Sequence, residues 1–199
     1  DSKKEKNVVI TPFMEHEWVG LNRVGKKAML FNYETKVDIK DLDHIVKTVY
    51  DLENPDLFIK KISRLMNDRK KMYDNDSIDW GMAETLAYGS ILKESYNVRI
   101  SGQDVERGTF SHRHAILKKE ISEENFIPLN NISEFQGKFE IYNSLLSEYA
   151  VMGFEYGYAL SNPNTLTVWE AQFGDFSNGA QIMIDQYLSA AEDKWKLQN

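Results

Sequence analysis

The stretch Asn97-Val-Arg-Ile100, followed directly by Ser101-Gly102, decides how this sequence is expected to fold. It predicts a short strand that ends at the glycine. A helical pattern over residues 79–96 precedes it, and an apolar stretch at residues 165–169 predicts a buried strand. Strand and helix patterns that alternate along a chain are typical of an α/β fold. Residues 98–100 and 166–169 are therefore expected in one largely parallel sheet with helices on both faces.

The remaining patterns of residues 78–199 extend this interpretation. Further strands are expected at 114–119, 126–129 and 139–142, and further helices at 147–160 and 178–195. The chain stops just after the last helix, where an α/β pattern would require another strand. We therefore expect a domain that is truncated at its C-terminus.

Residues 1–77 predict a mainly helical connector. An extended stretch is expected at 7–12, a helix at 38–50, and a second helix capped by Asn54 or Asp56. The apolar side of the second helix would hold Leu57, Ile62, Leu65, Met66 and Met72. Its cations are interpreted as a solvated face, with a docking surface for an acidic neighbour as the alternative. They are Lys60, Lys61, Arg64, Arg69, Lys70 and Lys71.

Composition excludes several classes of function. The chain has 199 residues, no cysteine and a formal net charge of −7. An acidic chain without a basic block is a poor candidate for binding nucleic acid, and a chain without cysteine has no disulfide or Cys-ligated metal site. No membrane span or signal peptide is expected. The first residue is Asp1 rather than Met, so the chain is expected to be part of something larger.

The first candidate site follows the strand at 97–100. Loops at the carboxyl ends of parallel strands are where α/β proteins bind their ligands. This loop contains Gln103, Asp104, His112 and His114. On a strand, the two histidines would share a face. Substrate contact and metal binding are alternatives to one hydrogen-bonded core histidine beside an exposed one.

Two further candidates lie in the last third of the chain. Ser147 is a good helix cap, which places Glu148 in the first turn of a helix, where the helix dipole favours a carboxylate. A structural role at the helix terminus and a chemical role are both open. The stretch 168–176 brings Trp169, Phe173 and Phe176 to the end of a strand, either as core residues or as a platform for a flat heterocycle.

Five blocks of the sequence, in the same order, resemble the decarboxylating component of 2-oxoglutarate dehydrogenase. The resemblance covers residues 78–199 strongly and residues 8–77 more weakly. The blocks are Ile78-Asp-Trp-Gly-Met-Ala-Glu84, the whole of 101–114, Asn143-Ser-Leu-Leu-Ser-Glu148, Gly153-Phe-Glu-Tyr-Gly157, and 169–181.

This resemblance implies an α/β pyrimidine-binding domain of a thiamine-diphosphate enzyme, preceded by a helical connector. The family oxidatively decarboxylates 2-oxoglutarate in the tricarboxylic acid cycle and passes the succinyl unit to a lipoyl group on a dihydrolipoyl succinyltransferase. The cofactor lies between two subunits of a homodimer. The expected compartment is the bacterial cytoplasm or the mitochondrial matrix. A further link to glycolysis is also expected.

The same resemblance implies roles for individual residues. Glu148 matches the glutamate that hydrogen-bonds the pyrimidine ring nitrogen and acts in catalysis. Phe176 matches the aromatic side chain that packs on the pyrimidine, with Phe173 beside it. Gln103 matches a polar residue that reaches toward the reacting end of the cofactor. His112 and His114 are expected near the substrate.

The sequence also departs from the family pattern. The Gly-Asp-Gly motif that binds magnesium and the diphosphate is absent, so the metal ligands are expected outside this chain and the isolated chain is predicted to be inactive. Alternatives are a non-catalytic interaction or dimerisation module, the related 2-oxoadipate dehydrogenase, and an unrelated hydrolase with Glu148 and Asp175 as a carboxylate pair.

Overall fold

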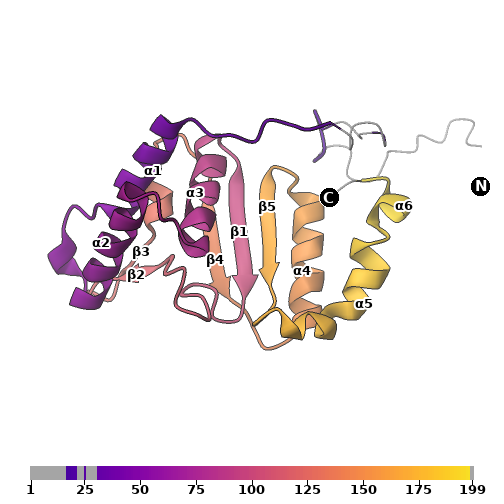
Figure 1. Cartoon of the computed structure of the whole chain (residues 1–199). Coiled ribbons are helices and arrows are strands. Elements are labelled where there is room, and N and C mark those ends of the chain that lie inside the picture. The colour runs from indigo at the N-terminus through magenta and orange to yellow at the C-terminus, as the bar shows by residue number, and fades with distance from the viewer. Residues whose placement is uncertain (1–16, 22–24, 26–30, 198–199) are drawn as a thin grey trace, which may run out of the picture.

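The computed structural model describes residues 17–21, 25 and 31–197; the expected extended stretch at 7–12 lies outside them. At the centre is β1 (Asn97–Gly102), flanked by β4 (Phe139–Asn143) and β5 (Thr165–Glu170). Both neighbours are parallel to β1, with Val98 opposite Phe139 and Leu166. Figure 1 shows the three strands side by side. The predicted parallel α/β sheet is confirmed.

The two faces of the sheet have different coverings. Val98 and Ile100 of β1 are fully buried in the main core, together with residues of β4 and of α3 (Trp80–Lys93). Arg99 points to the opposite face, because neighbouring strand residues alternate in direction. It binds Glu155 of α4 (Glu148–Ser161). Helices therefore cover both faces, as predicted.

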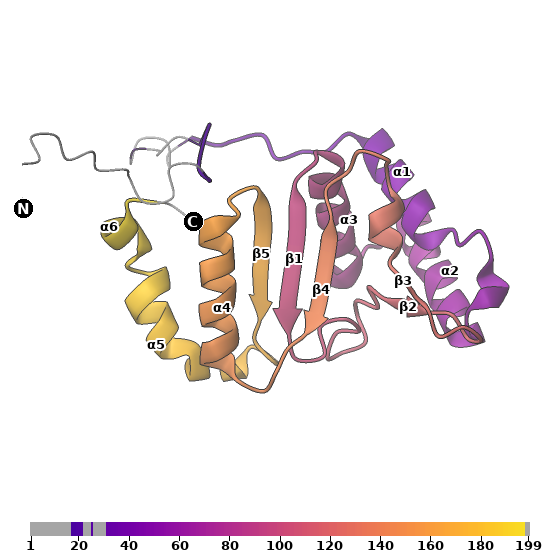
Figure 2. The same cartoon turned by 180° about the vertical axis from the view of Figure 1, so that it is seen from behind.

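Two connector helices extend the core beyond α3. The helix α1 (Ile39–Tyr50) begins where Asp38 accepts a hydrogen bond from the Lys40 amide at 2.9 Å. The second helix, α2 (Lys60–Asp74), lies beside it (Figure 2). Core residues from both helices join those of the sheet in one cluster. The division at residue 77 stays a prediction.

Two expectations about these helices are wrong. Neither Asn54 nor Asp56 caps α2, because Pro55 starts a separate 3-10 turn, η3 (Pro55–Leu57), and Phe58 then returns to extended backbone. The cations of α2 are not all solvated, since Arg69 is buried.

The expected strands at 114–119 and 126–129 shrink to a small hairpin. It consists of β2 (Leu117–Lys118) and β3 (Asn125–Phe126), paired antiparallel. His114 has a φ of 48°, which no strand residue adopts. Pro128 lacks an amide donor and opens a 3-10 turn instead, η4 (Pro128–Asn131).

The C-terminal region differs from prediction in two ways. The strand β5 is only half-buried, because it lies at an edge of the described sheet. The expected helix at 178–195 is broken into η5 (Asp175–Ala180), α5 (Gln181–Met183), a π-helical turn η6 (Ile184–Leu188) and α6 (Ala191–Trp195). The break is visible in the hydrogen bonds of Ser189, whose amide reaches back five residues to the Ile184 carbonyl. Within 17–21, 25 and 31–197, the helices are all too short or too polar to cross a bilayer.

Candidate functional site

The candidate site lies at the carboxyl edge of the sheet, where β1, β4 and β5 all end. The Ser144 amide donates to the Gly102 carbonyl at 2.7 Å, which joins the ends of β1 and β4. Gly102 has a φ of 156°, and a Cβ there would collide with the Glu170 carbonyl of β5. Only glycine allows the three strand ends to meet so closely.

Glu148 and Gln103 meet at this edge. The Gln103 side-chain amide donates to the Glu148 carboxylate, with Nε2 and Oε1 3.4 Å apart. Glu148 is the first residue of α4, so its charge faces the positive end of that helix. Ser147 precedes it as the cap residue, but its hydroxyl makes no capping bond.

The Glu148 carboxylate lines a small polar hollow and is half-buried. On its other side is Gly179 of η5, where a Cβ would lie 3.1 Å from Oε2 of Glu148. The hollow is lined by Gln103, Ser144, Leu145, Ser147, Glu148, Trp169, Glu170 and Gln172. Carboxylate and amide groups that converge on one space provide both an acceptor and a donor for a polar ligand.

Phe173 and Phe176 follow β5 at the same edge and are not core residues. Their side chains are 53% and 48% exposed. Phe173 makes an edge-on contact with Phe110, with ring centroids 5.8 Å apart, and Phe110 lies 6.3 Å from the His112 ring. Aromatic side chains thus form a row from Phe173 to His112, available to a flat ligand.

The structure separates the two histidines that the sequence places on one face. His112 belongs to the aromatic row, and its Nδ1 is buried without a hydrogen-bond partner in the described residues. His114 instead lines a small hollow with Tyr50, Thr85 and Tyr88. Burial, and then the nearby cations Lys61 and Arg107, lower the pKa of His114. The described residues contain no group of three or more His, Asp or Glu side chains that could hold a metal ion.

Arg113 is a residue of this region that the sequence did not single out. Its side chain is buried and donates to the Val105 carbonyl at 2.9 Å. It forms ion pairs with Glu84 of α3 and Glu170 at the end of β5. These two glutamates lie far from Arg113 in sequence, so no local pattern marks the cluster.

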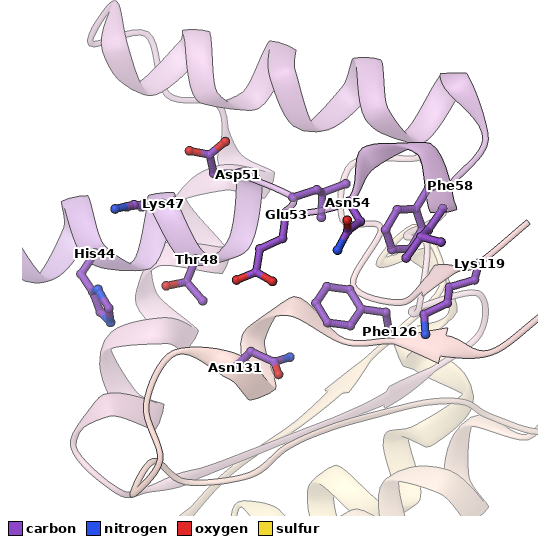
Figure 3. A pocket seen from close by; sticks show the side chains of 12 residues that line it. His44, Lys47, Thr48, Asp51, Glu53, Asn54, Phe58, Lys119, Phe126 and Asn131 are labelled. Atoms are coloured by element: carbon purple, nitrogen blue, oxygen red, sulfur yellow. The ribbon is translucent and has the colours of Figure 1, made fainter.

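A larger cavity lies elsewhere, between α1, η3 and the hairpin. It measures about 650 Å³ and has Phe58 and Phe126 in its wall (Figure 3). Two of its charged side chains already have partners: Asp51 pairs with Lys70, and Lys119 with Glu124. The smaller hollow at Glu148 has the stronger chemical case, because two of the predicted site residues, Gln103 and Glu148, meet there.

Comparison with known proteins identifies the class. The family model described as "Transketolase, pyrimidine binding domain" matches residues 76–199. The chain belongs to this family, whose members share the α/β fold of a thiamine-diphosphate site.

More specific relatives are 2-oxoglutarate dehydrogenases. The chain is 48% identical over 186 residues to "2-oxoglutarate dehydrogenase, mitochondrial" of Schizosaccharomyces pombe, covering 92% of this chain and 18% of that protein. It is 46% identical over 184 residues to the E1 component of Rickettsia felis, with the same coverage. For the Haemophilus influenzae E1 component, identity is 53% over 136 residues, covering 68% of this chain and 14% of that protein.

These relatives confirm the resemblance stated from the sequence blocks. The chain spans less than a fifth of the length of each relative. Their names give no support to the expected link to glycolysis, because they concern 2-oxoglutarate.

Proposed function

We propose that this chain supplies the aminopyrimidine half of a thiamine diphosphate site in a 2-oxoglutarate dehydrogenase. The observation that carries the proposal is the placement of Glu148. Its carboxylate lies at the carboxyl edge of a parallel sheet, hydrogen-bonded to Gln103 and close to Gly179 of η5, the turn that also carries the half-exposed Phe176. Such an edge is where open α/β sheets bind nucleotide-like ligands.

The residues present fit an aminopyrimidine ring. An aminopyrimidine has a flat face, a ring nitrogen that bonds a carboxyl group and an amino group that donates. Phe176 and Phe173 provide exposed aromatic surface, and Glu148 provides the carboxyl group. Gln103 adds one more polar group. When bound, the cofactor supplies a nucleophilic carbon that attacks the keto group of a 2-oxo acid.

Each residue then has a distinct task. Glu148 would share a proton with the pyrimidine ring nitrogen, so that the amino group of the bound cofactor could serve as a base. Phe176 packs against the ring and excludes water from it. Gln103 orients the Glu148 carboxylate. His112, at the end of the aromatic row, contacts the substrate; His114, which lines a separate hollow, has the weaker claim.

The remaining parts of the proposal concern groups beyond this chain. Magnesium and the diphosphate are held by residues elsewhere, because this sequence has no Gly-Asp-Gly motif. The working assembly is a homodimer that transfers a succinyl unit to the lipoyl group of a dihydrolipoyl succinyltransferase, within the tricarboxylic acid cycle. The compartment is the mitochondrial matrix or the bacterial cytoplasm, according to the source. By itself this chain is expected to be inactive toward 2-oxoglutarate.

Glu148→Gln in the full-length protein tests the central claim. Glutamine keeps the size of the side chain and one hydrogen bond but cannot share the proton. Cofactor affinity, measured by fluorescence quenching, should stay within about tenfold, since one hydrogen bond contributes about 1 kcal/mol. Turnover of 2-oxoglutarate should fall by about a hundredfold or more.

Two further variants complete the test. Asp175→Asn removes the other carboxylate considered for a hydrolase and should leave turnover within about twofold. Phe176→Ala should weaken cofactor binding more than it lowers the saturated rate. A Glu148→Gln protein with parental turnover would reduce Glu148 to a helix-terminal carboxylate. Turnover of 2-oxoglutarate compared with turnover of 2-oxoadipate decides between the two related dehydrogenases. A full-length protein that binds thiamine diphosphate but turns over neither substrate would favour a non-catalytic module.

A further inference from the structure

Arg69 differs from the other cations of α2 because it points into the protein. Its side chain is 8% exposed, whereas its neighbours on the helix are exposed or half-buried. A buried guanidinium is costly unless charged and polar partners take up its donors. The partners of Arg69 therefore explain why it is buried.

Those partners belong to two other parts of the chain. One guanidinium nitrogen pairs with Asp79, and the other donates to the backbone carbonyl of His112 at 2.7 Å. Asp79 also caps α3, accepting from the Met82 amide at 2.8 Å. Arg69 thus joins the connector, the start of α3 and the histidine segment in one network.

The His112 carbonyl has little freedom to leave this position. It lies against Gly81, where any side chain would collide with it. The amides that follow, of Arg113 and His114, both donate to the Arg107 carbonyl at 3.0 and 2.9 Å. Residues 112–114 are therefore held by the ion pairs of Arg113 with Glu84 and Glu170, and by the bond from Arg69 to the His112 carbonyl.

The His112 ring depends on this anchoring. Its Nδ1 has no hydrogen-bond partner in the described part of the chain, so no such bond fixes the ring through that nitrogen. The ring packs on Gly108 and lies near Phe110 instead. Its direction is therefore set largely by the backbone that carries it.

We propose that Arg69 is a positioning residue, which holds the imidazole of His112 at the end of the aromatic row by binding the His112 carbonyl. This inference rests on the proposed function, in which the row borders the cofactor. It makes the helical connector a working part of the active site, although no connector residue needs to touch substrate or cofactor.

The test compares Arg69→Gln, Arg69→Lys and Lys70→Gln in the full-length protein. Lys70 is the matched control, because it sits beside Arg69 but forms a solvent-exposed pair with Asp51, which contributes little. Arg69→Gln should lower kcat/KM for 2-oxoglutarate by about ten- to a hundredfold, the scale of a slightly misplaced catalytic group. Affinity for thiamine diphosphate should stay within about threefold. The kcat/KM of Arg69→Lys should lie between that of Arg69→Gln and that of the parent protein, since one ammonium replaces a two-armed donor.

Hydrogen exchange of residues 107–116 gives a second readout that does not require activity. The amides of this segment should exchange about tenfold faster in Arg69→Gln and at the parental rate in Lys70→Gln. If the parent protein fails to turn over 2-oxoglutarate, the proposed function fails, while exchange still decides the role of Arg69. Parental exchange and kinetics in Arg69→Gln would overturn the inference.

A purely structural role predicts a different pattern. In that case Arg69→Gln would melt earlier but keep parental kcat/KM per folded molecule and parental exchange in 107–116, which also overturns the inference. If Arg69→Gln fails to fold, the same two measurements, kcat/KM and hydrogen exchange of residues 107–116, are made on Arg69→Lys and Asp79→Asn. Asparagine still caps α3 but leaves Arg69 without its ion pair. Parental behaviour in both variants would overturn the inference.

Discussion

Individual charged residues hold together parts of this protein that are distant in sequence. Arg99 of β1 makes two hydrogen bonds to Glu155 of α4, at 2.8 and 2.9 Å. Its guanidinium carbon also lies 4.6 Å from the ring centroid of Tyr158 and 4.9 Å from that of Tyr142. Glu155 is buried because a two-armed ion pair satisfies both of its oxygens. The pair fixes α4, and with it Glu148, against the sheet.

His114 should make stability sensitive to mild acid. Burial lowers its pKa below the ordinary 6.5, and the cations Lys61, Arg107 and Arg69 lower it further, with a contribution from His112. As pH falls below 6.5, the unfolded chain gains a proton that folded His114 resists. Stability is therefore lost until pH passes the lowered folded pKa. His114→Gln should show a smaller loss of unfolding free energy between pH 7 and pH 5 than the parent does. Equal losses in chemical denaturation would show that His114 does not titrate this way.

At the scale of elements, α1 and α3 cross in close contact. Ile45 of α1 is fully buried against Gly89 of α3. A Cβ at Gly89 would lie 2.6 Å from the Ile45 Cγ2. The glycine therefore sets the distance between the two helices.

Gly89→Ala should destabilise the protein by about 1–3 kcal/mol, since overpacking outweighs the better helix propensity of alanine. Gly157→Ala on α4 is the control. Apart from the adjacent residues and backbone of α4 itself, no atom of the described chain lies within 4 Å of a Cβ there, so the same substitution should stabilise by up to about 1 kcal/mol. Thermal melts of both variants check this. Equal shifts would contradict the close contact at Gly89.

On the scale of the whole molecule, the two ends of the described chain differ. The end with α1, α2 and α3 contributes most of the buried core, whereas the region around α4 exposes large apolar side chains. The core lies between the sheet, α3 and the connector. On the side of β5, large apolar side chains remain exposed on α4 and just before it, among them Leu145, Leu146, Tyr149 and Phe154. Exposed apolar residues in such number are typical of an interaction surface. Their position next to Glu148 agrees with the proposed homodimer through the cofactor cleft.

Leu146→Asp in the full-length protein should therefore weaken self-association. Leu146 is 82% exposed and precedes α4, and a buried unpaired carboxylate at an interface is strongly unfavourable. Ile121→Asp is the control, because Ile121 is 96% exposed but sits in the hairpin at the connector end. Sedimentation velocity should show a dissociation constant at least about tenfold higher for Leu146→Asp alone. The same dissociation constant in both variants would place the interface elsewhere.

Local patterns predicted much of this fold. The strands at 97–102, 139–143 and 165–170 and the helices α1, α3 and α4 follow from periodicity and capping residues, which act over a few positions. The C-terminal helix was predicted as one element because its apolar spacing is regular, and the π turn before Ser189 has no local signal. The cap of α2 was misplaced because Pro55 fits a 3-10 turn as well as a helix start.

The sequence by itself determined the class of fold and, through the blocks around Glu148 and Phe176, predicted the type of site. Only the tertiary structure decided which side chains act together. It brought Gln103 to Glu148, parted His112 from His114, and buried Arg69 against the His112 carbonyl. These contacts join residues dozens of positions apart. They depend on how the helices pack against the sheet, a long-range property that short patterns do not encode.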